Sequence, residues 1–168
     1  MITNEVRDET RRLYDYRCGY CGISEAAIGN ELELDHFKPK SANGGDELEN
    51  LVYCCTSCNR RKGSFWPEAG EITKRLLHPK ADYLTLHLRQ EENGWLIALT
   101  ETGVFHIERF ELNRPRLIAL RQDWQLQQWK ESVNNEEETK RQNLRAEIQV
   151  SAERIQHLFD QINRMLSR

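Results

Sequence analysis

The clearest pattern of apolar and polar positions is a two-residue alternation over residues 31–36, which read Glu-Leu-Glu-Leu-Asp-His. This period predicts a β-strand with two different faces. Two glycines at residues 44–45 mark a turn, and the apolar residues 50–54 are expected to form the return strand. A short helix capped by Thr56 or Ser57 is expected next. The pattern therefore predicts the order strand, loop, strand, helix.

The segment that precedes this unit, residues 3–17, has the apolar spacing of a helix. Thr3 or Asn4 is its expected N-cap. We expect this helix to pack against the strands and to deliver Cys18 to them.

The segments that follow predict a second group of elements. Residues 67–81 read as a polar connector. Alternating leucines and a turn predict a β-hairpin over residues 83–100, and residues 104–110 have helical spacing. We therefore divide the chain into two regions, residues 1–80 and residues 81–168.

From Pro115 onward the pattern is helical, and a polar stretch at residues 132–138 is expected to separate two helices. The second of these carries apolar residues close to a heptad stripe: Leu144, Ile148, Ile155, Phe159, Ile162 and Leu166. The stripe fits a helical hairpin within the chain. It fits equally well an interface, either with a second copy in a homodimer or with a partner protein.

The composition is that of a soluble and rather polar protein, with 168 residues, 38% hydrophobic and 30% charged. This length allows one domain with a modest core, or a small catalytic unit with an extension. No apolar run approaches the roughly 18 residues of a membrane span, and the N-terminus lacks the apolar core of a signal peptide. We therefore expect a cytoplasmic protein with no membrane partner.

Four of the five cysteines form two Cys-x-x-Cys pairs, Cys18 with Cys21 and Cys55 with Cys58. Two such pairs can bind one tetrahedral Zn²⁺, because each short loop presents both sulfurs to the same point. The alternatives are unpaired core cysteines or a disulfide, which an intracellular chain disfavours. Cys54 does not keep the spacing to Cys58, so we expect it to be a small buried hydrophobic residue.

Together these motifs resemble the HNH endonucleases of the ββα-metal, or His-Me finger, class over roughly residues 17–66. The shared pattern is, in order, Cys-x-x-Cys, Asp-His, Gly-Gly, Asn-Leu-Val, Cys-x-x-Cys-Asn and Lys. The resemblance is to small stand-alone bacterial members with a zinc site. It implies an α+β fold, in which a ββα-metal core with structural zinc precedes a β-hairpin and a helical C-terminal extension. The third motif position, often histidine, is Asn59, as in some other members.

The resemblance also implies roles in phosphodiester hydrolysis. His36 would be the general base, since an imidazole can be neutral near pH 7. One divalent ion, Mg²⁺ or Mn²⁺, would act as Lewis acid and would be held by Asp35 and Asn59. The side chain of Asn50 would tie the loop between the strands and so fix His36 for catalysis.

The net charge of −3 is unusual for a nucleic-acid enzyme, since phosphate binding normally brings a basic surface. Cations nevertheless cluster beside the motif, and we expect phosphate contacts from Lys38, Lys40, Arg60 and Lys62. The leading hypothesis is a metal-dependent endonuclease that cleaves DNA. The alternative is a non-catalytic zinc-stapled module that binds nucleic acid or acts as an adaptor in a larger defence or mobile-element complex.

Overall fold

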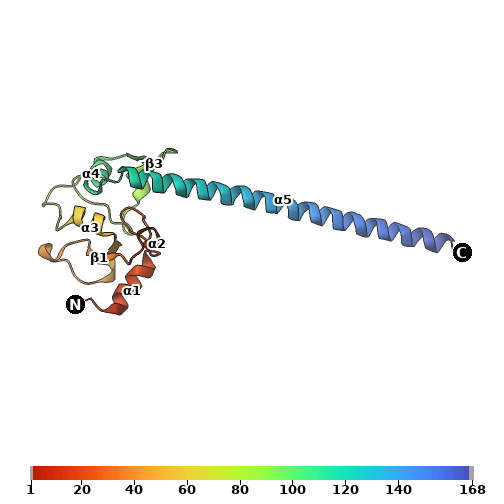
Figure 1. Ribbon diagram of the computed structural model, residues 1–168, viewed down its shortest axis with the longest axis horizontal. Helices are drawn as coiled ribbons and strands as arrows, with labels where there is room; N and C mark the ends of the chain where they lie inside the picture. Colours follow the sequence, from red (N-terminus) through yellow and green to blue (C-terminus); the bar gives the residue numbers. More distant parts are fainter. Residues whose placement is uncertain (1, 167–168) are drawn as a thin grey trace. The chain divides into compact units, whose positions relative to one another are not determined.

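The computed structural model of the chain describes residues 2–166, and Figure 1 shows the order of its helices and strands. The chain divides into two compact units, of which the first ends at Asp123 and the second begins at Trp124. All the predicted catalytic, metal-binding and phosphate-binding residues belong to the first unit.

A two-stranded antiparallel sheet forms the centre of the first unit, as the alternation predicts. β1 (Glu33–His36) pairs with β2 (Leu51–Cys54). The loop between them contains two short 3-10 turns, η1 (Lys40–Ala42) and η2 (Leu48–Asn50). All four residues of β2 are buried, whereas in β1 only Asp35 is. β2 is therefore the central strand of the core, and β1 borders the surface that carries the site.

The helix that follows the sheet is α3 (Thr56–Lys62), which completes the predicted strand, loop, strand, helix order. Its N-cap is Cys55 and not Thr56 or Ser57, which corrects the predicted cap. The side chain of Cys55 makes no capping hydrogen bond, because its sulfur faces the other paired cysteines.

The N-terminal helix α1 (Asn4–Leu13) is shorter than predicted. The hydroxyl of Thr3 accepts the N–H of Val6 at 3.3 Å, which identifies the N-cap. The helix ends before residue 17 because Asp15 and Tyr16 adopt left-handed φ angles of 50° and 58°. This turn redirects the chain toward the first cysteine pair.

The short helix α2 (Glu25–Ile28) links α1 to the sheet. Its Glu25 accepts hydrogen bonds from the guanidinium of Arg11 at 2.6 and 2.7 Å. The hydroxyl of Tyr53 on β2 donates to the same carboxylate and accepts the N–H of Leu32 at 2.8 Å. These bonds fix the chain between the first cysteine pair and β1.

The predicted hairpin is present but shorter than residues 83–100. β3 (Leu88–Gln90) pairs with β4 (Leu96–Ala98), whereas the first alternating leucines form a 3-10 turn, η3 (Leu84–Leu86). The helix α4 (Glu101–Phe110) follows, with Thr100 as its N-cap. The helical spacing after residue 103 therefore predicts the right element.

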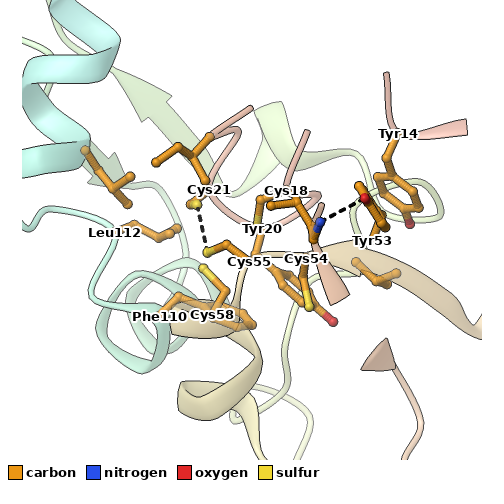
Figure 2. Packing of buried hydrophobic residues seen from close by; sticks show 14 of the residues in the cluster. Tyr14, Cys18, Tyr20, Cys21, Tyr53, Cys54, Cys55, Cys58, Phe110 and Leu112 are labelled. Atoms are coloured by element: carbon orange, nitrogen blue, oxygen red, sulfur yellow. Dashed lines mark hydrogen bonds between the residues drawn. The ribbon is translucent and has the colours of Figure 1, made fainter. Parts of the chain in front are cut away.

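The region after residue 80 packs into the same core as the cysteines. The ring of Phe110 stacks on that of Tyr20 at 4.3 Å between centroids (Figure 2). The end of the predicted polar connector is also buried, at Leu76 and Leu77, and the N–H of Leu77 donates to Nδ1 of His106 at 3.0 Å. The first unit thus continues past the predicted boundary at residues 80–81.

The C-terminal segment forms one helix, α5 (Pro115–Leu166), instead of the two helices predicted. Proline suits the first turn of a helix, where its missing N–H has no partner to lose. The polar residues 132–138 do not break the helix, because they include neither glycine nor proline. This continuity rules out the helical hairpin within the chain as the explanation of the heptad stripe.

Candidate active site and metal centre

The four paired cysteines converge at the N-terminal end of α3. Cys21 Sγ lies 3.8 Å from Cys55 Sγ, and Cys58 lies beside them (Figure 2). Together with Cys18, the four sulfur atoms all lie within 4.8 Å of one another, and all four residues are buried. Zn–S bonds of about 2.3 Å in a tetrahedron require sulfur atoms about 3.8 Å apart. The cluster therefore has the dimensions of a closed zinc site.

The surroundings of the cluster favour a metal over free thiols. No disulfide links any of the five cysteines. Burial raises the pKa of Cys18, because a thiolate loses its hydration there. A bound divalent cation offsets that cost for all four thiolates. Cys54 is buried outside the cluster, as predicted, and burial raises its pKa too.

His36 ends β1, and its side chain is 22% exposed. Its Nε2 lies 2.7 Å from Oδ1 of Asp46, and Nζ of Lys40 lies 2.8 Å from the same oxygen. Lys40 and then His36 hold the pKa of Asp46 below its usual range, so this carboxylate is ionised. An ionised carboxylate only accepts hydrogen bonds. The imidazole hydrogen therefore lies on Nε2, which leaves Nδ1 as the basic nitrogen.

The side chain of Asn50 binds the loop that follows His36 at three points. Its Oδ1 accepts the N–H of Lys38 at 2.8 Å, and its Nδ2 donates to the carbonyls of Lys38 and Gly45 at 3.1 and 2.9 Å. A Cβ on Gly44 would lie 1.7 Å from the Lys38 carbonyl, so this close approach requires glycine. These contacts set the path by which Asp46 returns to His36.

Asp35 points to the opposite face of β1 from His36, since successive side chains in a strand alternate. It is only 7% exposed, and its two oxygens accept hydrogen bonds from the Tyr20 hydroxyl at 2.6 Å and from Nζ of Lys62 at 2.9 Å. Burial raises the pKa of Asp35, and the bonds from Tyr20 and Lys62 oppose that rise. Lys62 is fully buried and also donates to the His36 carbonyl at 2.7 Å. Lys62 is thus an internal counter-ion, which corrects its prediction as a phosphate contact.

Asn59 lies one helical turn before Lys62 and so faces the same strand. Its Nδ2 donates to Oε2 of Glu33 at 2.6 Å, and Thr56 donates to the other oxygen. Glu33 and Asp35 share one face of β1, because they are two positions apart in the strand, with only Leu34 between them. The structure therefore brings Asp35 and Asn59 to the face of the sheet that α3 covers.

Three residues of this site were not predicted: Tyr20, Glu33 and Asp46. The period of β1 would have placed Glu33 beside Asp35, since the two share a face. Asp46 follows the Gly-Gly turn, but only the folded loop brings it to His36. Tyr20 lies between the first two cysteines and gives no signal of its own in the sequence.

The remaining predicted phosphate contacts differ in their surroundings. Nζ of Lys38 lies 5.7 Å from the ring centroid of Trp66. Lys40 pairs with Asp46, as described above, and the side chain of Arg60 is exposed on α3. Three of the four predicted cations therefore reach the surface near His36 or on α3.

A statistical model of the HNH endonuclease family matches residues 18–65. This segment is an HNH domain. It contains both cysteine pairs, the β1–β2 sheet and the whole of α3. Within the described residues, its cysteine cluster is the one group of three or more His, Cys, Asp or Glu ligands close enough together to hold a metal ion.

The chain that carries this HNH domain is also similar to Septu protein PtuA of Bacillus mycoides strain KBAB4, with 24% identity over 139 residues. The match covers 66% of this chain and 19% of the relative, so the chain spans about a fifth of that protein's length. No solved structure matches the chain. None of the described helices combines the length and apolar character that a bilayer crossing requires.

Proposed function

We propose that the HNH domain hydrolyses DNA phosphodiester bonds with a divalent metal ion as cofactor. The observation that supports this most strongly is the position of His36. Its imidazole is partly exposed at the end of β1, it is held by the ionised carboxylate of Asp46, and Asn50 fixes the loop between the two. A fixed and partly exposed imidazole that keeps one nitrogen without a proton is suited to accept a proton from water.

In this proposal Nδ1 of His36 takes the proton of the attacking water. The positive imidazolium that results is stabilised by Asp46, whose oxygen lies 2.7 Å from Nε2. Lys40 shares that oxygen and so keeps the carboxylate ionised during the transfer. Asn50 acts as a positioning residue, because its three hydrogen bonds hold the backbone on which this pair depends.

Asp35 and Asn59 would hold the divalent ion, Mg²⁺ or Mn²⁺, because their side chains offer the oxygen ligands that such hard ions prefer. Lys62 places a positive charge 2.9 Å from Oδ1 of Asp35 and therefore competes with the ion for this carboxylate. When bound, the ion would act as a Lewis acid toward the phosphate and its leaving oxygen. Asp35 must then exchange or share its bond to Lys62, so we expect weak metal binding before substrate arrives.

We further propose that Zn²⁺ at Cys18, Cys21, Cys55 and Cys58 is structural. A site closed by four thiolates has no open position for water or substrate. Its role would be to clamp the two ends of the segment that carries β1, β2 and the start of α3.

Cleavage of supercoiled plasmid DNA tests the proposed function. The protein is dialysed free of added divalent metal, its zinc content is measured, and Mg²⁺ or Mn²⁺ is added. We expect nicked or linear DNA with either ion and intact DNA without them. Intact DNA under all conditions, with folded protein that retains zinc, would contradict the proposal and favour the non-catalytic adaptor.

The long helix supports a second proposal, that α5 joins two copies of the chain. Residues 144–165 repeat in steps of four and three, with isoleucine at one heptad position and mainly leucine or methionine at the other: Ile148, Ile155 and Ile162, then Leu144, Ser151, Leu158 and Met165. All the apolar members are at least half exposed. Isoleucine at position a with leucine at position d favours parallel two-stranded coiled coils. We therefore propose a parallel homodimer.

Light scattering of the full chain over a range of concentrations tests this association. We expect the unmodified chain to be a dimer. Ile155→Asp combined with Leu158→Asp, one residue from each of the two heptad positions, should convert it to a monomer without lowering the stability of the first unit. Glu153→Ala, on the face opposite the stripe, is the matched control and should remain dimeric. A monomer at every concentration of the unmodified chain would refute self-association and leave a partner protein as the occupant of the stripe.

A further inference from the structure

A cavity that the proposed chemistry does not use begins at the residue after His36. It has a volume of about 170 Å³ and is lined mainly by aromatic and apolar side chains: Phe37, Phe65, Trp66, Pro67, Arg75 and Leu76. We call it the aromatic cavity. Its place in the chain ties it to the candidate active site, because Phe37 is bonded through its N–H to the Asn50 carbonyl at 2.8 Å.

The walls of the aromatic cavity are fixed by ring contacts. Phe37 meets Trp66 edge-on, with centroids 6.0 Å apart and an interplanar angle of 90°. The ring of His78 contacts Phe37 at 4.6 Å. Trp66 nevertheless leaves 40% of its surface exposed. A large aromatic side chain held by neighbours but open on one side is suited to stack on a flat ligand.

Positive charge lies at the edge of the aromatic cavity. Nζ of Lys38, two residues after His36, is 5.7 Å from the Trp66 centroid. Arg75 also lines the cavity, and its guanidinium fork is occupied by Asp82 at 2.9 and 3.0 Å. Lys38 can therefore attract a phosphate beside the exposed ring, and in the chain it lies two residues after the proposed general base.

We propose that the aromatic cavity binds one unpaired nucleobase next to the phosphate that is presented to His36. A nucleotide joins a flat apolar base to a phosphate. The structure offers a partner for each: the exposed ring of Trp66 and the ammonium of Lys38, which lies 5.7 Å from the ring centroid and two residues after His36 in the chain. Stacking on aromatic rings accepts any base, since every base has a π face. A hydrophobic side chain of a partner protein would not need Lys38 or the position beside His36.

This inference rests on the proposed function and adds a substrate class to it. A base inside a duplex is stacked and paired, so it must leave the helix to enter a protein cavity. Unpairing has no cost in a single strand or a bulge. The protein should therefore prefer single-stranded or locally unpaired nucleic acid to an intact duplex.

Binding of fluorescent oligonucleotides to the full chain tests the inference. The His36→Ala background prevents cleavage, and zinc is retained. The probes are a single strand, the same sequence as an intact hairpin duplex, and a series of single strands with one abasic site at successive positions. Trp66→Ala is compared with Trp66→Phe, which keeps a ring, and with Trp129→Ala, which removes an exposed tryptophan of α5.

We expect the single strand to bind more tightly than the duplex, and Trp66→Ala to weaken it by about 5- to 150-fold, the range for one lost base stack. Trp66→Phe should recover most of the affinity, and Trp129→Ala should change nothing. One abasic position should weaken binding to the unmodified cavity but have no further effect on Trp66→Ala.

Equal affinity for the single strand and the duplex would overturn the inference. It would also be overturned if Trp66→Ala weakened binding but no abasic position weakened binding in a way that depends on Trp66. Neither result would affect the proposed metal-dependent cleavage. A Trp66-dependent abasic effect in a protein that never cleaves nucleic acid would instead uphold the base site and contradict the proposed hydrolysis. The two proposals can therefore fail separately.

Discussion

The cysteine cluster and the His36 site lie on the same ββα unit but differ in how complete they are. The four sulfur atoms have converged to within 4.8 Å of one another and need only the metal. The groups proposed for hydrolysis are each bound to another part of the protein: Asp35 to Lys62, Asn59 to Glu33 and His36 to Asp46. The cysteine site therefore consists of four identical ligands that face one another. The side chains of the His36 site are instead positioned by ion pairs and hydrogen bonds to other residues.

This difference indicates that the two sites have different relations to the fold. Four buried thiolates within 4.8 Å of one another repel each other, so metal binding there is linked to folding. Asp35 already has a counter-ion in Lys62, so the fold does not require the second metal. We infer that zinc belongs to the folded state and that the hydrolytic metal arrives with substrate.

Removal of one zinc ligand should give the largest effect. Cys58→Ser should lose the metal and unfold the HNH domain, because zinc linkage of roughly 10 kcal/mol is comparable to a whole domain's stability. Cys54→Ala is the matched control: it is buried in β2 outside the cluster, so it should keep zinc and lose about 1 kcal/mol. Elemental analysis and circular dichroism measure both. A Cys58→Ser variant that is folded without zinc would contradict the claim that zinc binding at the cysteine cluster is linked to folding.

Removal of the counter-ion should give the next largest effect. Lys62→Met leaves the buried carboxylate of Asp35 without its cation, which should lower the free energy of unfolding by about 3–5 kcal/mol. Adding Asp35→Asn should restore most of this loss. Urea unfolding with and without Mg²⁺ provides a sharper test, because the ion should stabilise Lys62→Met more than the unmodified protein. No loss of stability in Lys62→Met would show that the pair is not the internal partner described above.

A pH titration should reveal a smaller contribution from the core that both sites share. Burial lowers the pKa of His106 from its ordinary 6.5 to about 4. The unfolded chain takes up a proton below pH 6.5 while the folded His106 stays neutral, so the free energy of unfolding should fall as the pH drops from about 6.5 to 4. The full loss is on the order of 3 kcal/mol. His106→Gln should make the free energy of unfolding nearly independent of pH between 6.5 and 4, measured where the zinc content does not change. The same pH dependence in His106→Gln as in the unmodified protein would exclude His106 as its cause.

The cysteine site could be predicted from sequence because its spacing and ligand chemistry act locally. Two residues between cysteines determine that both sulfurs face one point, whatever the rest of the chain does. The strand, loop, strand, helix order follows for a similar reason, since the alternation over residues 31–36 and the Gly-Gly turn are local signals. The resemblance to HNH endonucleases added the expected roles of Asp35, His36 and Asn59.

The partners of these residues could not be predicted, because they depend on how distant segments pack. The sequence around Lys62 suggests a basic surface, and only the packing of α3 on β1 turns its ammonium inward to Asp35. Asp46 reaches His36 only through the path that Asn50 imposes on the loop. The error in α5 has another cause, since the polar residues 132–138 lack the glycine or proline that ends helices.

The most direct test of the central claim is the cleavage rate of His36→Ala measured with Mg²⁺ on folded protein that retains zinc. His87→Ala is the matched control, since His87 also forms a hydrogen bond at the surface, to Thr100 at 2.7 Å, but lies outside the HNH domain. We predict that His36→Ala lowers turnover by about two to four orders of magnitude, the range for loss of a general base. His87→Ala should leave turnover unchanged. Equal cleavage by His36→Ala and the unmodified protein would contradict the proposed active site.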